Sequence, residues 1–419
     1  MFFYCSFAKL LKSDTESLKL FLIIFIIYYL GNNIYVFIRS SRFSTNHKII
    51  KSTIVGFHLL LPLAVFLMIV FAGKPHLNPK IFSLYFELNY VALFFFSALF
   101  FLFHAYVIAD IIVFVFYRKR TQGSAIRLRR IFHKSALLLI FIFWSLLIYG
   151  KFVTLSDFKI RTHYINHPKL PASFDGLKIV HFSDTHLGSF RNEEIVIQGI
   201  ELIKKQNPDL ILFTGDLVNI AANEALPFID AFSSLEATYG KYAVLGNHDL
   251  SDYMKMDIRR DSLNVNTLEI VHVLNDMGFF VLRDTSVFIS NGTDSIILAG
   301  IDNWGKPPFK GISNPEKVTD NLKPEYFTIL LSHDPSFWEE YVKDKQEVDL
   351  TLSGHTHGMQ LGIRTKSFQW SPVSLKYPYW AGLYFNNQNV LHVNPGFGYI
   401  GMPFRIGIHP EISVLIISN

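Results

Sequence analysis

The sequence has a single cysteine, Cys5, among its 419 residues. It therefore cannot form an intrachain disulfide or a zinc site built from cysteines. Charged residues are also scarce at 17%, whereas 50% of the residues are hydrophobic, and there is no internal repeat or low-complexity tract. This composition excludes a disordered, collagen-like or disulfide-rich protein, and the length suits two or three domains.

Acidic residues are almost missing from the first part of the chain. Residues 1–155 hold 4 Asp/Glu, 17 Lys/Arg and 24 of the 41 Phe, whereas the remainder holds 30 Asp/Glu and 22 Lys/Arg. The first part is too apolar for a soluble fold. The second part has the ordinary composition of a globular domain of about 265 residues.

Four long apolar stretches lie in the first part. A bilayer core requires about 20 mainly apolar residues in helical form, because lipid offers no other partner to backbone amides and carbonyls. We predict an all-α transmembrane region over residues 1–155, with helices at residues 20–38, 53–72, 90–117 and 135–155. The protein is then a multi-pass integral protein of the cell membrane.

The orientation in the membrane follows from the short loops. The loops after the first and third stretches are richest in Lys and Arg, which are retained on the cytoplasmic side. We therefore predict that everything after the fourth helix is extracytoplasmic. Basic residues also flank the first and fourth stretches, so the opposite orientation is the alternative.

Three ionisable residues fall within the apolar stretches, namely His58, His104 and Asp110. Such residues suggest a pathway or a ligand site, which would suit a transporter or sensor. His104 and Asp110 are six residues apart, however, and so point to different sides of one helix. We favour a structural role, in which they form hydrogen bonds between helices or, for Asp110, lie near the cytoplasmic end.

A linker and a new domain follow. Residues 156–176 are mixed in character and include the stiff stretch His167-Pro168-Lys169-Leu170-Pro171, so we predict a linker there. From residue 177 to residue 419, short apolar runs rich in β-formers alternate in places with helical segments. This pattern predicts an α/β domain with largely buried strands.

Metal-capable side chains follow five of these strands, at the points where the strands end. Strand carboxyl ends border the site crevice in open α/β sheets, so residues distant in sequence can gather there. Carboxylates, imidazoles and an amide without a thiolate suit Mn, Fe or Zn. The residues occur in Ser183-Asp184-Thr185-His186, Gly215-Asp216, Gly246-Asn247-His248-Asp249, Ser332-His333-Asp334 and Gly354-His355-Thr356-His357. We interpret the nearby His181 and His392 as hydrogen-bonded polar residues.

The order D-x-H, G-D, G-N-H-D, a later His and G-H-T-H resembles the calcineurin-like metallophosphoesterase superfamily over residues 177–401, in a membrane-anchored, bacterial-type member. The resemblance implies a sandwich of two mixed sheets flanked by helices, and two divalent metal ions, with manganese one candidate. It implies that Asp216 bridges the metals and that a metal-bridging hydroxide attacks phosphorus. The implied ligands are Asp184, His186 and His357 for one metal, and Asn247, His333 and His355 for the other.

His248 follows the implied ligand Asn247 and would protonate the leaving group as general acid. Many members have a carboxylate three residues after the bridging Asp, which can steady the catalytic imidazolium. This chain has Asn219 there, and a neutral amide stabilises that charge less. Asp249 is a candidate substitute.

The implied function is hydrolysis of a phosphomonoester, phosphodiester or pyrophosphate, possibly linked to a lipid or the cell envelope. The alternatives are a cytoplasmic-facing pyrophosphatase of a nucleotide-linked sugar lipid, and a transporter or sensor with a non-catalytic phosphate-binding domain. The aromatic segment 368–384 suits packing, a substrate lid or contact with the membrane interface. The acidic second part argues against nucleic acid as a main partner.

Overall fold

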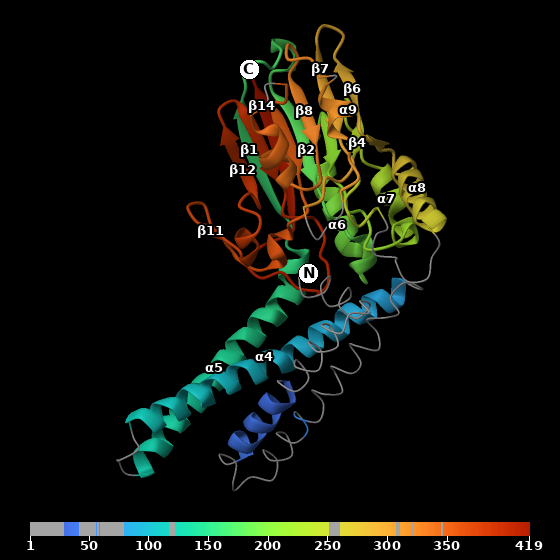
Figure 1. Ribbon diagram of the computed structural model, residues 1–419. Coiled ribbons are helices and arrows are strands. Elements are labelled where there is room, and N and C mark those ends of the chain that lie inside the picture. Colours follow the sequence, from blue (N-terminus) through green and yellow to red (C-terminus); the bar gives the residue numbers. More distant parts are fainter. Residues whose placement is uncertain are drawn as a thin grey trace. The chain divides into compact units, whose positions relative to one another are not determined.

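The computed structural model describes residues 29–41, 56, 58, 79–116, 122–250, 260–306, 311–320, 322–344 and 347–419. The chain divides into two compact units (Figure 1). The first, the helical unit, comprises Met1–Leu77 and Leu84–Tyr149. The second, the sheet unit, comprises Asn78–Ser83 and Gly150–Asn419.

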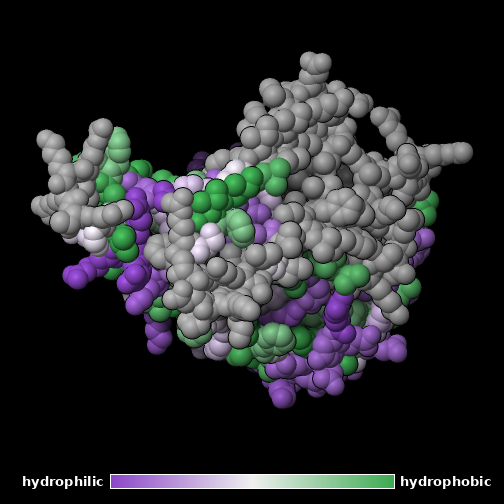
Figure 2. All heavy atoms as spheres, turned by 90° about the horizontal axis from the view of Figure 1, so that it is seen from below, coloured by the Kyte–Doolittle hydropathy of each residue, from purple (hydrophilic) through white to green (hydrophobic). Residues whose placement is uncertain are grey.

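Two helices of the described chain are long and apolar enough to cross a membrane. They are α4 (Pro79–Phe116) and α5 (Gln122–Phe152), with candidate spans Leu84–Phe116 and Gly123–Ser156. Large apolar side chains such as Phe114 and Phe141 lie on the outside of these helices. Figure 2 shows in green where hydrophobic residues reach the surface on one face of the molecule. Helices that are apolar on every side are typical of membrane spans.

These two helices overlap the stretches predicted at residues 90–117 and 135–155, with α4 ending at Phe116 and α5 at Phe152. Within the described residues the structure therefore has two such helices, against the four predicted for the whole chain. Residues 29–41, at the end of the first predicted stretch, are helical. The rest of that stretch, and residues 53–72 except for the helical residues 56 and 58, lie outside the described residues.

Asp110 is the centre of a polar cluster in the helical unit. One carboxylate oxygen accepts a hydrogen bond of 2.7 Å from the Tyr35 hydroxyl and pairs with Arg39, and the other lies 2.8 Å from Arg129 Nε. The ring of His104 instead bonds the carbonyl of Phe100 in its own helix, at 2.8 Å. The interpretation of Asp110 as a contact between helices is confirmed, and these described residues give no shared ligand site with His104.

The sheet unit contains two six-stranded sheets. The first has the order β1 (Lys159–Asn166), β14 (Glu411–Ser418), β2 (Leu177–Phe182), β3 (Leu210–Phe213), β4 (Lys241–Ala243), β5 (Phe280–Val281). The second has the order β12 (Gly382–Asn386), β13 (Asn389–Val393), β9 (Leu350–Ser353), β8 (Thr328–Leu331), β7 (Ser295–Gly300), β6 (Thr285–Ser290). Both are mixed, because β2 pairs antiparallel to β14 but parallel to β3, and β13 pairs antiparallel to β12 but parallel to β9.

Strand β1 lies within the stretch predicted as a linker. It pairs in parallel with β14 from Lys159 opposite Glu411 to Asn166 opposite Ser418. As an edge strand it carries polar residues such as Arg161 and His163, so it has no continuous apolar run. The structure thus differs from the prediction for residues 156–176, since this stretch completes the first sheet.

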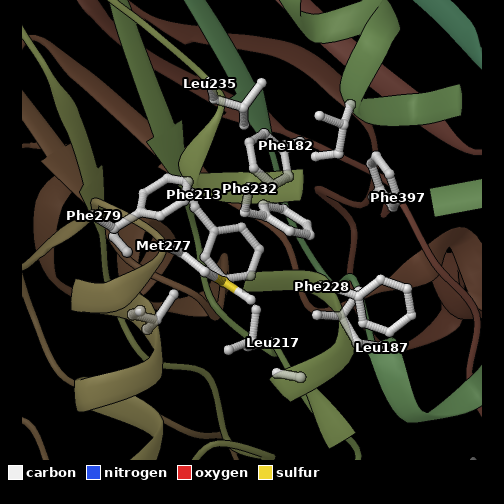
Figure 3. Packing of buried hydrophobic residues seen from close by; sticks show 14 of the residues in the cluster. Phe182, Leu187, Phe213, Leu217, Phe228, Phe232, Leu235, Met277, Phe279 and Phe397 are labelled. Atoms are coloured by element: carbon white, nitrogen blue, oxygen red, sulfur yellow. The ribbon is translucent and has the colours of Figure 1, made fainter. Parts of the chain in front are cut away.

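Apolar layers fill the space between the sheets and cover both outer faces. Alternate residues of each strand point to opposite sides, so Ile179 of β2 packs between the sheets while Val180 packs under helices. Helices α6 (Glu193–Lys204), α7 (Ile229–Ser233) and α8 (Arg260–Asp276) cover the first sheet, with the aromatic cluster of Figure 3 beneath them. Helix α9 (Pro315–Thr319) and the segment Trp338–Val342 cover the second. Burial on both faces explains the near-continuous apolar strands.

Candidate metal centre

The predicted site residues follow the carboxyl ends of parallel strands. Asp184 and His186 follow β2, Asp216 follows β3, and Asn247 and His248 follow β4 in the first sheet. From the second sheet, His333 follows β8, and His355 and His357 follow β9. All eight side chains are buried.

The carboxylates and imidazoles form two converging groups. Asp184, His186 and His357 form one, and Asp216, His333 and His355 form the other. Within the first, Nε2 of His357 lies 3.0 Å from Nε2 of His186 and 3.2 Å from Oδ1 of Asp184. Within the second, Nε2 of His333 lies 3.2 Å from Nδ1 of His355 and 3.2 Å from Oδ2 of Asp216. These two buried groups are consistent with a dimetal site.

One oxygen of Asp216 joins the groups. Its Oδ2 lies 3.2 Å from His333 Nε2 in its own group and 3.6 Å from His186 Nε2 in the other. The other oxygen accepts a hydrogen bond of 2.8 Å from the backbone amide of His248. Asn247 lies in this same turn, between Gly246 and His248. The turn after β4 is thereby fixed against the carboxylate that both groups share.

Backbone carbonyls select the nitrogen that each histidine can offer to a metal. The Nδ1 atoms of His186 and His333 lie 3.2 Å from the carbonyl of Val218 and 2.7 Å from that of Thr214. A carbonyl only accepts, so in each ring Nδ1 carries the proton and Nε2 holds the lone pair in the neutral form. Such orientation by the other ring nitrogen is typical of metal ligands, so the residues present fit the implied ions.

The backbone at the site is strained. Asp184, His186, Asp216, His355 and His357 have φ values of 55°, 44°, 59°, 70° and 50°. Residues with a Cβ atom avoid this left-handed region, at a cost of roughly 1–3 kcal/mol each where it persists. Such strain clusters at functional sites, because packing elsewhere in the fold sustains it. Its presence at five candidate ligands favours a functional role for the loops.

Two glycines of the motifs make room for the ligands. A Cβ atom on Gly246 would lie 2.2 Å from Oδ1 of Asp216, and one on Gly354 would lie 2.0 Å from Oγ of Ser183 and 2.3 Å from Oδ2 of Asp184. No side chain fits at either position. The glycines of G-N-H-D and G-H-T-H therefore allow the strand ends to approach one another.

The two candidate acidic ligands, Asp184 and Asp216, are held ionised against the effect of burial, because neighbouring histidines lower the pKa of each carboxyl group. Burial opposes ionisation of Asp216, but the charges of His333 and His248 outweigh burial and hold its pKa well below the ordinary range. Burial by itself would lower the pKa of His333, yet Asp216 and Asp184 raise that pKa to about 10. The carboxylates thus attract positive charge to the centre of the site.

His248 is oriented by a backbone carbonyl. Its Nδ1 lies 2.7 Å from the carbonyl oxygen of Asn219, and burial lowers the pKa of the ring. The side chain of Asn219, which stands where many family members have a carboxylate, bonds Ser189 and Glu224. At residue 219 it is therefore the backbone carbonyl that contacts the ring of His248.

The carboxylate of Asp249 is hydrogen-bonded to the loops of the site. Its two oxygens accept hydrogen bonds from the backbone amides of Asp216 at 2.7 Å, of Gly246 at 2.9 Å and of Leu217 at 2.9 Å. Burial and the charge of Asp216 raise its pKa to about 7. These hydrogen bonds fix the loops, and the role of Asp249 as a substitute for the missing carboxylate stays a prediction.

Sequence reasoning missed the carboxylate beneath the His248 loop. Glu224 is buried, and its oxygens accept hydrogen bonds from the backbone amides of Asn219 at 2.7 Å, Ile220 at 2.8 Å and Ala221 at 3.0 Å. It therefore fixes the carbonyl that orients His248. The sole sequence signal was an acidic residue five positions after Asn219, which belongs to no motif.

Contacts of His355 and His357 were also missed. The hydroxyl of Tyr377 lies 3.0 Å from Nε2 of His355, and an oxygen of Asp334 lies 3.9 Å from the same atom. The guanidinium of Arg405, which is fully buried, lies 3.3 Å from Nδ1 of His357. The Tyr377 hydroxyl can accept a hydrogen bond from Nε2 of His355 and so orient this ring as a metal ligand. Arg405 has only donors, so its contact leaves Nδ1 of His357 as the acceptor.

A third histidine cluster lies beside the first sheet. His163, His392 and Glu411 could converge on an ion, but Glu411 already pairs with Arg161 at 3.0 Å and with Arg364. Two guanidiniums disfavour a further cation at this carboxylate. His181 and His392 bond each other at 2.9 Å, and His181 bonds Thr214, which confirms their interpretation as hydrogen-bonded polar residues.

Comparison with known proteins gives consistent matches to the sheet unit. A sequence model of the calcineurin-like phosphoesterase family matches residues 177–359. The chain is 30% identical over 278 residues to YkuE, an uncharacterized metallophosphoesterase of Bacillus subtilis, covering 65% of this chain and 89% of that protein. It is 31% identical over 202 residues to an uncharacterized metallophosphoesterase of Aquifex aeolicus, covering 48% and 70%.

The chain is also similar to a protein that is named as a transmembrane protein. A protein of Danio rerio called transmembrane protein with metallophosphoesterase domain is 30% identical over 260 residues, covering 60% of this chain and 55% of that protein. The chain thus spans about half the length of this relative.

Proposed function

The chain belongs to the calcineurin-like phosphoesterases, a family of metal-dependent hydrolases, and we propose that it is a membrane-anchored dimetal phosphoesterase. It would hydrolyse a phosphomonoester, phosphodiester or pyrophosphate. The observation that carries the proposal is the shared position of Asp216, whose Oδ2 lies within 3.6 Å of imidazoles from both buried groups. A carboxylate in that position can bind two cations at once.

Each predicted ligand has a place in this proposal. Asp216 would bridge the ions, and carboxylates with imidazoles and an amide suit Mn, Fe or Zn. When bound, two such ions lower the pKa of a water molecule and neutralise phosphate oxygens. Asp184, His186 and His357 would hold one ion, and Asn247, His333 and His355 the other.

His248 would supply the proton for the leaving oxygen. Its Nδ1 proton is donated to the carbonyl of Asn219, so the second proton of the charged ring is held at Nε2. A proton at Nε2 can pass to a leaving alkoxide, and such general acid catalysis contributes roughly 10²–10⁴-fold to rate. The fixed carbonyl orients the ring for this step.

The membrane anchor suggests the substrate class. We propose four spans in all, a multi-pass location in the cell membrane and an extracytoplasmic catalytic domain. A site tethered beside a bilayer meets lipid-linked or envelope-linked phosphoesters at high effective concentration. Efficient cleavage of soluble esters without cleavage of any lipid-linked phosphate would remove this part of the proposal. A tag at Asn419 that an impermeant protease cannot reach in intact cells would contradict the orientation.

The first experiment measures hydrolysis of p-nitrophenyl phosphate and bis(p-nitrophenyl) phosphate by the full chain in detergent, with manganese, zinc or iron. We expect activity in the parent and none in Asp216→Asn at equal folded yield. Asp110→Asn is the control, because it makes the same substitution at a carboxylate of the helical unit that belongs to neither buried group. Equal activity in Asp216→Asn and the parent would overturn the dimetal proposal.

A further inference from the structure

One face of a small hairpin in the sheet unit is apolar and exposed. Strands β10 (Ile363–Arg364) and β11 (Gln369–Trp370) pair antiparallel, with Ile363 opposite Trp370. Opposite residues share a face, and so do residues two apart in an extended chain, which adds Leu361 and Phe368. The exposed fractions are 36% for Leu361, 52% for Ile363, 57% for Phe368 and 47% for Trp370. We call these four residues the apolar face.

The other face of the hairpin is bound to the domain. Arg364 pairs with the buried Glu411, and the side-chain amide of Gln369 donates to the carbonyl of Ala381 at 3.2 Å. The hairpin is therefore held with its apolar face outward. Next along the chain, the short helix Pro372–Leu375 ends at Leu375, which is 87% exposed. By contrast, Tyr377 and Trp380 are buried. Packing in the core therefore explains only some of the aromatic residues in the segment 368–384.

The surrounding sequence is free of negative charge. There is no Asp or Glu between Asp349 and Glu411, although the chain after residue 155 is acidic overall. Lys366 lies exposed in the hairpin turn, and Lys376 follows Leu375. Aromatic and aliphatic side chains flanked by lysines are typical of surfaces that bind the interface of anionic membranes.

The hairpin is also joined to the end of the candidate membrane span. The last turn of α5 belongs to the sheet unit, and the carbonyl of Gly150 accepts a hydrogen bond of 3.2 Å from the amide of Arg405. The next residue, Ile406, accepts a hydrogen bond of 2.9 Å from the amide of Gly362, which precedes β10. The segment 405–406 thus connects the end of the helix directly to the base of the hairpin.

We propose that the apolar face, with Leu375, is a bilayer-contact surface that enters the headgroup region of an anionic leaflet. This proposal rests on the membrane anchoring that is part of the proposed function, and it does not depend on hydrolysis. The surface leads directly into Tyr377, whose hydroxyl contacts the candidate ligand His355. Contact with lipid would therefore fix the side of the metal centre at which a substrate in the same leaflet arrives.

The test compares two phenylalanines of equal exposure. Phe368 and Phe288 are each 57% exposed, and Phe288 lies on β6 at the edge of the second sheet. In a Cys5→Ser background, Phe368→Cys and Phe288→Cys are labelled with the environment-sensitive dye NBD, and the full chain is reconstituted in nanodiscs of phosphatidylglycerol. We expect brominated phosphatidylglycerol to quench the label at residue 368 about twofold and to leave the label at residue 288 nearly unchanged.

Each result bears on the proposal. Equal quenching at the two positions, or none at residue 368, would overturn it. A blue-shifted emission at residue 368 without lipid quenching would also overturn it, because another protein surface would then cover the face. Leu375→Cys is the second variant if Phe368→Cys does not fold. Hydrolysis by the unlabelled parent is measured in the same nanodiscs, so a failure of this inference is distinguishable from a failure of the proposed function.

Discussion

Asp110 of the helical unit and Asp216 of the sheet unit are both withdrawn from water, but they are neutralised differently. Asp110 pairs with two guanidiniums, from Arg39 and Arg129. Among the described residues, the ion pairs of Asp216 are with imidazoles alone, those of His186 and His333. The first carboxylate has its balancing charge built into the protein, whereas the second faces groups that can release a proton and bind a metal.

This difference separates a structural cluster from a reactive one. A guanidinium is always charged and cannot ligate a metal, so the Asp110 cluster is complete without any added ion. Imidazoles are neutral or charged according to their surroundings, and their lone pairs are metal ligands. Backbone strain follows the same division, since Asp216 has a φ of 59° and Asp110 lies in a regular helix. The comparison predicts opposite responses of the two sites to mutation and to metal.

The largest expected effect is on the stability of the helical unit. Asp110→Asn leaves Arg39 and Arg129 without their balancing charge, and losing hydrogen bonds to a charged group costs about 1.5–3 kcal/mol. We expect a lower free energy of unfolding, measured by loss of helical circular dichroism in detergent. Glu87→Gln in the same helix is the control and should cost less. Hydrolysis per folded molecule should stay unchanged, and a parallel loss of activity would contradict the division between the two clusters.

Binding of metal should stabilise the sheet unit and leave the stability of the helical unit unchanged. Manganese at about 100 times its dissociation constant should raise the free energy of unfolding of the sheet unit by about 2.7 kcal/mol, because it binds the folded state. The transition of the helical unit should not move. Calorimetry with and without EDTA tests this, with Asp216→Asn as the variant that should not respond. A shift of both transitions, or of neither, would break the comparison.

Most of the metal centre could be predicted because its residues occur in short motifs at strand ends. The apolar runs at residues 177–182, 210–213, 349–352 and 390–393 correspond to strands β2, β3, β9 and β13 of the structure. Strand β1 was missed, because its partner β14 lies some 250 residues later and its own residues alternate in polarity. Such a strand is specified by its partner more than by its own sequence.

The groups that position the ligands could not be predicted for a similar reason. Glu224 and Tyr377 reach the site through loops whose paths the sequence does not specify. An isolated Glu or Tyr matches no motif, and its role depends on which carbonyl, amide or imidazole lies beside it. The contact of Asn219 with His248 is of the same kind, because it is made by the backbone carbonyl of Asn219 and not by the side chain that the sequence specifies.

Glu224→Gln sharpens the comparison within the sheet unit, because Glu224 is a third buried carboxyl group and is hydrogen-bonded by backbone amides without a charged partner. The amide of Gln would face backbone donors, and an unsatisfied buried donor costs about 1–3 kcal/mol. Because the Asn219 carbonyl loses its support, we also expect the turnover rate to fall roughly 10-fold or more. Chemical denaturation and steady-state kinetics measure the two effects, with the exposed Glu201→Gln as control.

The difference in free energy of unfolding between the parent and Glu224→Gln should increase as the pH falls. Burial raises the pKa of Glu224 in the folded state above its ordinary value. The folded protein therefore holds this proton more tightly than the unfolded chain, so the parent gains stability as pH falls through the raised pKa. Gln cannot titrate, so the parent should exceed the variant by more at pH 5 than at pH 8. A difference that grows with rising pH would show that Glu224 is stabilised as the anion.

The smallest expected effect tests whether the contact of Tyr377 with a candidate ligand matters beyond packing. Tyr377→Phe removes the hydroxyl that lies 3.0 Å from Nε2 of His355, and a hydrogen bond of this kind contributes about 1 kcal/mol. We expect roughly fivefold weaker manganese binding, measured by titration calorimetry, with little change in thermal unfolding of the metal-free protein. Tyr384→Phe is the matched control, because its hydroxyl bonds only backbone groups and Gln369 in the same segment. Equal weakening in both variants would mean that the aromatic segment acts through packing, and that the Asp216 centre does not depend on an oriented His355.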